Sequence, residues 1–169
     1  GAPRIMKICR KFSDMLSYSV EYSNDFTTLS QEFIHTENYL FLMKERYGEN
    51  LEYKIIRPVN NALSHVCPKL FLQPLVENAI YHGMEFMDGD GEIRIRVYRD
   101  GDDLYMKVSD NGLGMTTEQI EKMFSDRKHV ASKSGSGIGV RNVNERIRLY
   151  FGMDYGLSIE SELDEGTTV

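Results

Sequence analysis

The stretch Leu72–Gly83 constrains the fold of this chain more than any other part of the sequence. Its apolar residues recur at the spacing of an amphipathic helix, yet the adjacent residues Glu77 and Asn78 are polar. Neighbouring residues on a helix point about 100° apart, so these two side chains cannot both belong to the core. The apolar pattern does not require such a pair, and the plain alternative is a surface Glu beside a helix-capping Asn. Pro74 removes a backbone donor, so it either bends this helix or marks its true start.

The first of two glycine clusters follows at Asp110–Met115, which reads DNGLGM. We expect Asp110 at the end of a strand, where its ionised carboxylate can only accept hydrogen bonds. Such a group can bind the exocyclic amine of a base, and it rejects guanine, which presents a carbonyl at that position. Gly112 and Gly114 allow positive φ and a close approach of the main chain to a flat base. A hairpin turn is the commonest use of Asp-Asn-Gly, so this cluster taken alone favours a turn.

The second cluster, Gly135–Val140, lies just before a stretch with helical spacing. The amides of Gly135, Gly137 and Gly139, together with the helix N-terminus, can hold phosphate oxygens. A lone glycine-rich turn before a helix is weak evidence. It is not a dinucleotide fingerprint, because no strand immediately precedes it and its spacing departs from G-x-G-x-x-G. The sequence also has no Walker A motif and none of the protein-kinase signature motifs.

Taken together and in this order, the Glu-Asn helix, the Asp-Asn-Gly-x-Gly turn and the Gly-x-Gly-x-Gly turn resemble the ATP site of the gyrase, heat-shock-90, histidine kinase and MutL superfamily. The segments QPLVENAIYHG and SGSGIGVRNVNERIRLYFG are closer still to the LytS/YesM-like group of sensor histidine kinases. The resemblance covers nearly the whole chain. It implies an α+β fold, a two-layer α/β sandwich of the Bergerat ATP-binding type, in which a mixed sheet carries helices on one face.

The resemblance also implies an activity, namely binding of ATP with Mg²⁺ and transfer of the γ-phosphoryl group to a histidine and then to a response regulator. It assigns Mg²⁺ to Asn78, whose amide oxygen is a hard ligand. It assigns to Glu77, the expected catalytic residue, the positioning or deprotonation of the attacking histidine. Asp110 would receive the adenine amino group. The residues expected to bind nucleotide lie in or near these motifs: Asn78, His82, Asp110, Gly112, Gly114, Met115, Phe124, Lys133, Gly135, Gly137, Ile138, Gly139 and Thr167.

Three of these residues take supporting roles by the same resemblance. His82 would line the nucleotide site, and Phe124 matches the hydrophobic position that anchors a lid between the two glycine clusters. Thr167 would belong to a Gly-Thr pair that supports the adenine site.

One position departs from the family pattern. Many histidine kinases place a phosphate-contacting Lys three residues after the metal-binding Asn, whereas this chain has Tyr81 there. Positive charge could come instead from Ser125–Ser136, a polar stretch that we expect to be a mobile loop. The alternative is that the loop cations are only solvated. These cations are Arg127, Lys128, His129 and Lys133.

A histidine kinase needs an acceptor histidine, which in the resembling family lies in an N-P-H-F-type segment. None of the four histidines in this chain has that context: His35, His65, His82 and His129. His35 lies in the middle of a helical stretch, and we expect it to be a surface or half-buried residue. The acceptor is therefore expected upstream of this chain, and the chain alone should not autophosphorylate.

We divide the chain into two parts. Residues 1–48 are expected to be the C-terminal part of a helical dimerisation and phosphotransfer region, with residues 1–3 the remnant of a tag. Residues 49–169 are expected to be the ATP-binding catalytic domain, truncated at its C-terminal strand. Apolar residues from Arg4 to Tyr22 follow the alternating spacing of a helical seam, which we expect to pack in a bundle across a homodimer of the full-length protein. A helix lying on its own domain is the alternative.

Periodicity and capping signals predict the remaining elements. They are a helix from Thr28 to Gly48, a strand Leu51–Arg57, a loop Pro58–Val66, a helix starting near Pro68, a hairpin of Gly91–Arg99 and Asp102–Ser109, a helix Thr116–Phe124, a helix Gly139–Phe151 and a strand Gly156–Leu163.

Composition narrows the possible functions. A net charge of −6 argues against a protein that depends on neutralising nucleic-acid phosphates. Cys9 and Cys67 are too few for a disulfide framework, and we interpret them as reduced thiols in a cytosolic setting. No apolar run approaches the ~20 residues needed to cross a bilayer, so we expect no membrane contact by this chain.

The resemblance implies the cytoplasmic domain of a membrane-anchored sensor. A same-fold ATPase clamp, a serine-directed kinase and a degenerate docking or dimerisation domain are the alternatives.

Overall fold

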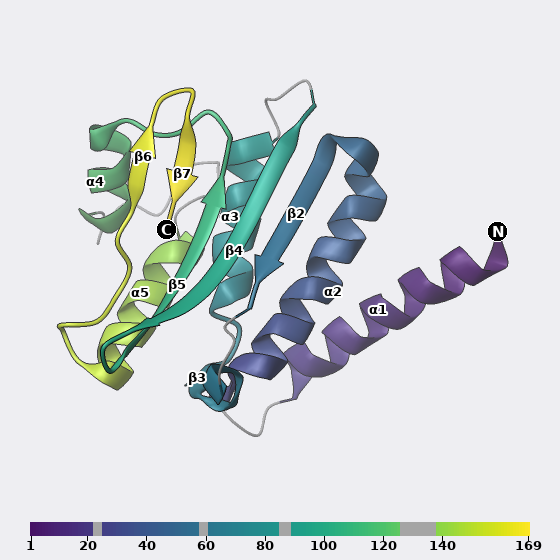
Figure 1. The fold of residues 1–169 in the computed structure, drawn as a ribbon, viewed down its shortest axis with the longest axis horizontal. Coiled ribbons are helices and arrows are strands. Elements are labelled where there is room, and N and C mark those ends of the chain that lie inside the picture. The colour runs from purple at the N-terminus through teal and green to yellow at the C-terminus, as the bar shows by residue number, and fades with distance from the viewer. Residues whose placement is uncertain (22–24, 58–60, 85–88, 126–137) are drawn as a thin grey trace.

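The computed structural model describes the backbone of residues 1–21, 25–57, 61–84, 89–125 and 138–169, and their side chains except at 61, 82–84 and 125. These residues form two layers, a five-stranded sheet and helices behind it, with one helix projecting from the body (Figure 1). In chain order the elements are α1 (Ala2–Val20), β1 (Phe26–Thr28), α2 (Leu29–Tyr47), η1 (Gly48–Asn50), β2 (Leu51–Ile56), η2 (Asn61–Ser64), β3 (Val66–Pro68), α3 (Leu72–Met84), β4 (Gly91–Asp100), β5 (Asp103–Asp110), α4 (Thr117–Ser125), α5 (Ile138–Phe151), β6 (Glu160–Glu162) and β7 (Gly166–Thr168).

The main sheet has the strand order β2-β4-β5-β7-β6. Strands β2 and β4 are parallel, and the other neighbours are antiparallel. A separate two-stranded antiparallel sheet joins β1 to β3. The mixed sheet with helices on one face is the α+β architecture predicted from the sequence.

The predicted hairpin is the centre of the main sheet. Ile93, Ile95 and Val97 of β4 alternate with exposed arginines and are buried against the helical layer. Helix α3 presents Leu72 and Val76 to the same core. Burying one such side chain stabilises the fold by about 1.5–3 kcal/mol, so this interface fixes α3 against the sheet.

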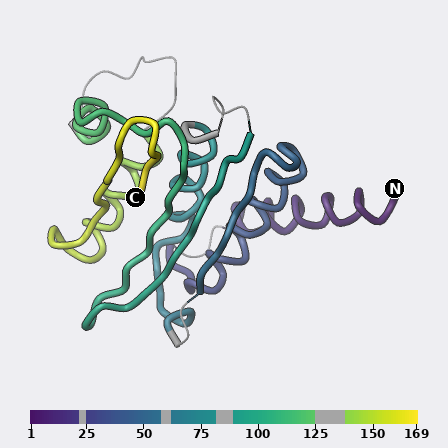
Figure 2. Tube along the Cα trace, turned by 45° about the horizontal axis from the view of Figure 1, so that its top comes forward, coloured from purple at the N-terminus to yellow at the C-terminus, as the bar shows by residue number. Residues whose placement is uncertain are grey.

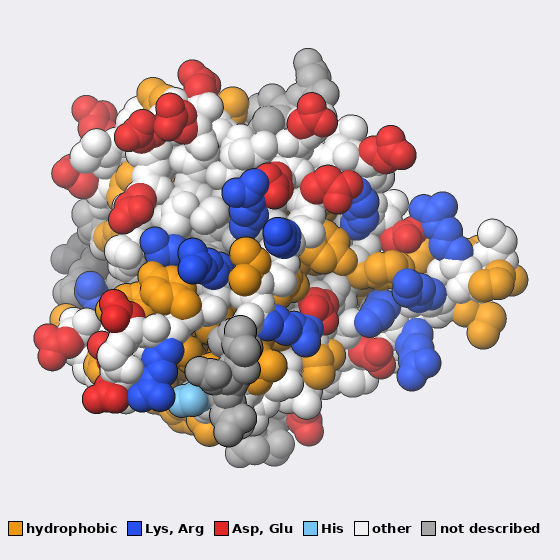
Figure 3. Space-filling model, viewed as in Figure 1, with side chains coloured by type: hydrophobic (Ala, Val, Ile, Leu, Met, Phe, Trp, Pro, Cys, Tyr) orange, Lys and Arg blue, Asp and Glu red, His pale blue; other side chains and the backbone are white. Residues whose placement is uncertain are grey.

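No helix in the described part of the chain covers the other face of the sheet (Figure 1). Figure 3 shows Lys and Arg side chains gathered over the middle of this face. Arg96 of β4 lies opposite Lys107 of β5, and Arg94 lies opposite Lys54 of the parallel strand β2. Basic side chains therefore gather on one face of a chain with a net charge of −6.

Several predicted helix ends are confirmed. The Thr28 hydroxyl accepts a hydrogen bond from the Gln31 backbone N–H at 3.4 Å at the start of α2, and Gly48, with φ of +63°, ends that helix. At α4 the capping box is complete, because Thr116 N–H donates to the Gln119 side chain at 2.7 Å and Gln119 N–H donates to Thr116 Oγ1 at 3.3 Å.

Helix α1 lies along α2 and extends away from the sheet (Figures 1 and 2). None of its residues is buried, although Ile8 and Met15 are half-buried on the α2 side. The neighbouring stripe is open, with Ile5 63% exposed, Phe12 54% exposed and Leu16 50% exposed. No helix in the described part of the chain is both long and apolar enough to span a membrane.

The segment before α3 differs from prediction. Residues 66–68, predicted as the end of a loop and the start of a helix, form the short strand β3, and Pro68 ends it. Helix α3 begins at Leu72, so Pro74 lies in its first turn, where a missing N–H costs no helical hydrogen bond. Three-residue strands such as β1 and β3 are too short to show a period of two, which is why the sequence did not reveal them.

The strand predicted over Gly156–Leu163 is shorter in the structure and comprises only Glu160–Glu162. The backbone N–H of Leu157 donates instead to the Asn144 side-chain oxygen at 2.8 Å. Asn144 belongs to α5 and is buried, so this bond ties the chain to the helix before strand pairing begins.

Candidate functional site

Helix α3 carries the polar pair on two neighbouring stripes. Glu77 is exposed and Asn78 is half-buried, whereas Val76 and Ala79 on either side are buried. Glu77 lies one turn after Gln73, whose side-chain amide donates to Glu77 Oε1 at 2.7 Å. Neither residue belongs to the apolar core, so packing against the sheet does not explain why the helix carries this polar pair.

The start of α3 is held by a residue that sequence analysis missed. The buried carboxylate of Glu32 in α2 accepts hydrogen bonds from the backbone N–H groups of Leu70 at 2.7 Å, Phe71 at 3.1 Å and Leu72 at 3.3 Å. The hydroxyl of Tyr18 in α1 donates to the same carboxylate. A carboxylate at a helix N-terminus satisfies free N–H groups and interacts favourably with the helix dipole.

His35 also differs from prediction. It was expected to be a surface or half-buried residue, but it is only 2% exposed. Its Nε2 lies 2.5 Å from the side-chain oxygen of Gln73, so α2 contacts α3 through this pair. A signal was available for Glu32, because it lies three residues after the buried Leu29, and a polar residue beside an apolar stripe needs a specific partner. His35 lies six residues after Leu29, away from that stripe, and it packs against Tyr18 of α1 instead.

Glu77 also affects its surroundings through charge. The pKa of the Tyr39 hydroxyl in α2 is raised, first by burial and then by the charge of Glu77. The side of α3 that carries Gln73 and Glu77 therefore faces α2.

Asp110 stands at the end of β5, as predicted, between β4 and β7. Its Oδ1 accepts the backbone N–H of Gly112 at 3.0 Å. Burial raises the pKa of this carboxyl, while hydrogen bonds from the backbone of Gly112 and of Thr167 act in the opposite direction. The site is a half-buried acceptor that is held in place by two main-chain donors.

The turn after Asp110 packs closely against the β6–β7 hairpin. Gly114 has φ of +66°, and a Cβ atom there would lie 1.8 Å from the backbone oxygen of Glu162. Met115, which is buried, donates its N–H to Ser161 Oγ at 2.7 Å, and that hydroxyl also contacts Thr167 Oγ1 at 2.9 Å. Glycine at position 112 would also allow a positive φ, but Gly112 is not among the positive-φ glycines of the described chain.

The start of α5 lies next to the first turn of α3. A Cβ atom on Gly139 would be 3.1 Å from Cβ of Pro74, so only glycine permits this approach without a shift. Asn78 lies one turn beyond Pro74 on the same stripe, and Ile138 is the first residue of α5. This stripe therefore faces a helix N-terminus, where free N–H groups are available to an anion.

The remaining predicted residues are placed only in part. Phe124 is half-buried in α4, and Thr167 is buried in β7. Lys133, Gly135, Gly137 and the loop cations lie outside the described residues, as does the side chain of His82.

Two hollows lined by described residues lie away from Asp110. One, of about 520 Å³, lies between α1 and α2, and another, of about 530 Å³, lies beneath β5 and the end of α5. Neither has Asp110 or Asn78 in its lining. The chemistry of the candidate site therefore rests on its residues rather than on the size of a cavity.

The described residues thus form a two-layer domain with a carboxylate at the end of a central strand, an Asn on the helix behind the sheet and a second helix that starts beside that helix. Residues 68–169 match the family of histidine kinase-, DNA gyrase B- and HSP90-like ATPases, and the chain belongs to this family. Residues 1–51 match a second family model, described as histidine kinase. The resemblance predicted from the sequence is confirmed.

Named relatives are sensor proteins. The chain is 32% identical over 167 residues to the sensor histidine kinase YesM of Bacillus subtilis, which covers 98% of this chain and 27% of that protein. It is 34% identical over 142 residues to the sensor protein LytS of Bacillus cereus, covering 83% of this chain and 23% of that protein. It is 30% identical over 176 residues to the sensor histidine kinase BtsS of Escherichia coli, covering 98% and 29%. The chain thus spans less than a third of the length of these relatives.

A solved structure has the same fold. The histidine kinase domain of the blue-light activated histidine kinase from Erythrobacter litoralis superposes with a TM-score of 0.56 at 12% identity, covering 96% of this chain and 70% of that chain. The predicted fold class is therefore confirmed.

Proposed function

We propose that this chain is the catalytic part of a sensor histidine kinase, in which residues 49–169 bind ATP with Mg²⁺ and deliver the γ-phosphoryl group to a histidine located upstream of residue 1. From that histidine the group would pass to a response regulator. The membership of residues 68–169 in the ATPase family supports ATP binding, and the match of residues 1–51 to a histidine kinase model favours a kinase over a clamp-type ATPase. The relatives' names support a sensor histidine kinase. We further propose, from the resemblance alone, that the parent protein is membrane-anchored and that this part lies in the cytoplasm.

Asp110 would accept a hydrogen bond from the exocyclic amine of adenine. The geometry of this carboxylate is the observation that best supports the proposal. Main-chain donors from Gly112 and Thr167 hold the carboxylate, so an oxygen lone pair remains for the exocyclic amine. Guanine would bring a carbonyl oxygen against this acceptor, and neither group could donate. The half-buried position makes that mismatch costly, about 1–3 kcal/mol for one unsatisfied group.

Asn78 would hold the metal ion. No group of three or more His, Cys, Asp or Glu side chains in the described chain forms a metal site. Mg²⁺ commonly keeps several waters and is bound by few protein oxygens together with substrate phosphates, so one amide oxygen beside a phosphate-binding helix start fits its chemistry. When bound, the ion would neutralise charge on the phosphates. The main-chain amides at the start of α5 would hold the phosphate oxygens.

Glu77 would orient the attacking imidazole and accept its proton. As the nitrogen–phosphorus bond forms, the bond from the γ-phosphorus to the bridging oxygen breaks and ADP leaves. Positioning and electrostatics supply most of the catalysis in such transfers. Glu77 is exposed on the side of α3 that faces α2, where an acceptor helix can approach.

The open stripe of α1 would form the dimer. Ile5, Phe12 and Leu16 share one side of the helix and are at least half exposed. An apolar stripe of this kind on a projecting helix is typical of a bundle that a second copy completes.

Calorimetric titration tests the nucleotide site directly. We expect the chain to bind ATP more tightly with Mg²⁺ than without it and not to bind GTP measurably. Asp110→Asn should weaken ATP binding at least tenfold, because one hydrogen bond to the base is lost and a donor faces the amine. Asp100→Asn, at the opposite end of the same hairpin, is the matched control and should leave binding unchanged. Equal binding of ATP and GTP, or no binding at all, would refute the proposed site.

A further inference from the structure

Hydrogen bonds join three side chains in a row that begins at the buried His35 of α2 and ends at the exposed carboxylate of Glu77 in α3. His35 Nε2 lies 2.5 Å from Gln73 Oε1, and Gln73 Nε2 donates to Glu77 Oε1 at 2.7 Å. The three residues come from two helices, since His35 belongs to α2 and the other two to α3. One amide side chain therefore links a buried ring to an exposed carboxylate.

The direction of this row is fixed by the carboxylate. An ionised Glu side chain only accepts hydrogen bonds, so the amide nitrogen of Gln73 must face Glu77 and its oxygen must face His35. An amide oxygen also only accepts, so Nε2 of His35 must carry the proton. The charge state of Glu77 thus determines the amide orientation of Gln73 and requires a proton on one particular nitrogen of His35.

Packing alone does not account for His35. The ring is almost fully buried, and its Nδ1 has no hydrogen-bond partner among the described residues. Burying a polar atom without a partner costs free energy, and an apolar side chain of similar volume would avoid that cost. The imidazole contributes one thing that an apolar residue cannot, namely the N–H donor toward Gln73.

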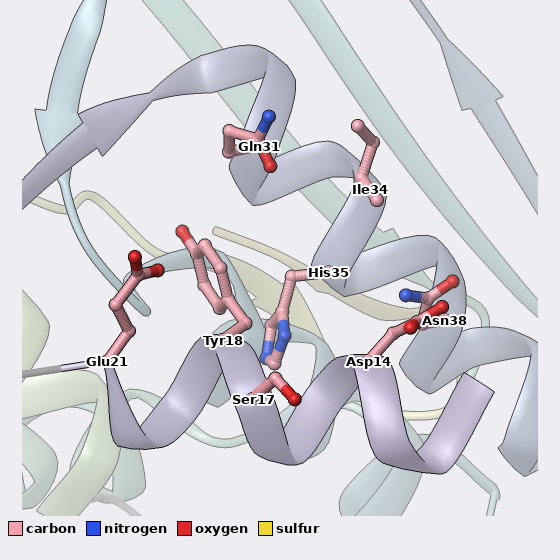
Figure 4. A pocket seen from close by; sticks show the side chains of 8 residues that line it. All are labelled: Asp14, Ser17, Tyr18, Glu21, Gln31, Ile34, His35 and Asn38. Atoms are coloured by element: carbon pink, nitrogen blue, oxygen red, sulfur yellow. The ribbon is translucent and has the colours of Figure 1, made fainter. Parts of the chain in front are cut away.

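Helix α1 forms the outer wall of this row. Figure 4 shows the His35 ring pointing from α2 toward α1, beside the ring of Tyr18. The two ring centroids are 4.6 Å apart with an angle of 31° between their planes. Tyr18 also donates its hydroxyl to Glu32, which in turn holds the first turn of α3, where Gln73 lies. Helix α1 therefore contacts the base of the row through Tyr18, whose ring packs against His35 and whose hydroxyl donates to Glu32.

We propose that Gln73 and His35 are positioning residues that hold the carboxylate of Glu77 in the orientation needed for phosphoryl transfer. This inference rests on the role of Glu77 in the proposed function. An exposed Glu side chain has several freely rotating bonds, and a single charge-assisted hydrogen bond from a fixed amide restricts them. Gln73 is hydrogen-bonded in turn to His35, whose ring packs against Tyr18. Neither Gln73 nor His35 belongs to the set of residues that we propose for nucleotide binding.

The test uses the parent protein that carries the upstream acceptor histidine, and it measures ATP affinity and the single-turnover rate of histidine phosphorylation separately. Gln73→Met keeps the length of the side chain but removes both hydrogen bonds. We expect the rate to fall about tenfold while the ATP dissociation constant stays within about twofold, because positioning acts on the transition state. Gln31→Met, an exposed position in the first turn of α2, is the matched control and should change neither quantity.

The donor on His35 is tested by two substitutions. His35→Phe keeps an aromatic ring beside Tyr18 without the N–H donor and should slow transfer to the same extent as Gln73→Met. His35→Gln supplies an amide N–H at similar reach and should restore most of the rate. In a Glu77→Gln background, Gln73→Met should have no further effect, since residues that act as a unit are not additive.

The outcomes separate the inference from the function on which it rests. If Glu77→Gln slows transfer but Gln73→Met does not, the positioning role is wrong and the function stands. A parallel loss of ATP affinity in Gln73→Met would also refute it, because that would indicate a general structural role. Full activity of Glu77→Gln would refute the role of Glu77 and with it the positioning role, whereas no ATP binding by the unsubstituted protein would refute the proposed function itself.

A second measurement does not depend on activity. Nitrogen NMR of the histidine rings in this chain should show a proton on Nε2 of His35, and His35→Phe would assign the signal. A proton on Nδ1 alone would mean that Gln73 Oε1 has no donor, and the row would not exist as described.

Discussion

Glu32 in α2 accepts a hydrogen bond from the backbone N–H of Leu72, the first residue of α3, at 3.3 Å. The same carboxylate also binds the two preceding backbone N–H groups, so one residue of α2 caps the helix that carries Glu77 and Asn78. Residue 32 lies in the segment that matches the histidine kinase model, and residue 72 lies in the segment that matches the ATPase family. The cap therefore joins the two matched regions into one structural unit.

Removing this cap should destabilise the chain strongly. Glu32→Ala leaves three backbone N–H groups and the Tyr18 hydroxyl without their acceptor in a buried place, so we expect the free energy of unfolding to fall by about 3 kcal/mol. Glu32→Gln keeps one acceptor oxygen and should cost less. Urea unfolding followed by circular dichroism measures both. Glu49→Gln, on the exposed turn after α2, is the control and should stay within about 0.5 kcal/mol of the parent chain.

The parts of the fold that the sequence predicted are those with long periodic patterns. The hairpin of β4 and β5, the helices α2 and α5 and both capping signals depend on local spacing, and they occur where expected. The strands β1 and β3 could not be predicted, because each has three residues and pairs only through contacts that are distant in sequence. The long strand expected after Gly156 failed for a similar reason, since the side chain of Asn144 competes for the backbone of Leu157.

For the candidate site, the sequence likewise predicted residues in continuous motifs but not residues that meet across separate helices. Asp110 and Asn78 belong to motifs that are continuous in sequence, so their positions followed from the motifs themselves. Glu32, His35 and Gln73 act through contacts between separate helices, and no local pattern shows which buried polar residues will meet. Only Glu32, three residues after the buried Leu29, showed by its spacing that it would need a partner.

The charge of Asp110 should cost stability while it serves binding. Burial raises the pKa of its carboxyl above the ordinary value of 3.8, so the folded state binds the proton more tightly than the unfolded state does. By linkage, stability then falls as the pH rises through the folded-state pKa, and the cost is fully present at neutral pH. Asp110→Asn should therefore unfold no more easily than the parent chain near pH 7, although it loses ATP affinity. Any advantage should shrink as the pH is lowered, and urea titrations at several pH values measure this. A variant that is clearly less stable at neutral pH would show that the carboxylate is needed for folding.

The two cysteines should differ in reactivity. Burial, and secondarily the charge of Glu32, raises the pKa of the Cys67 thiol to about 12, whereas Cys9 is exposed. Near pH 8 only about one Cys67 side chain in ten thousand would be a thiolate, and the thiolate is the reactive form. We expect a thiol reagent to label one cysteine rapidly in the folded chain and the second only after denaturation, which mass spectrometry resolves. Rapid labelling of both sites, with Cys9→Ser as the control, would show that the layer around Glu32 opens readily.

Gly166 should be essential to the shape of the turn that follows Asp110. It has φ of +104°, and a Cβ atom there would lie 2.1 Å from the backbone oxygen of Asp110 and 2.9 Å from Cα of Asn111. Gly166→Ala must therefore displace the main chain at Asp110, and we expect a loss of more than about 3 kcal/mol of stability together with weaker ATP binding. Gly101→Ala is the matched control, because Gly101 also has a positive φ, of +60°, but no atom within 4 Å of the added Cβ. That control should cost only about 1 kcal/mol through backbone strain and leave ATP affinity unchanged. Equal losses in the two variants, measured by urea unfolding and calorimetry, would mean that strain alone, rather than the contact with Asp110, makes glycine necessary.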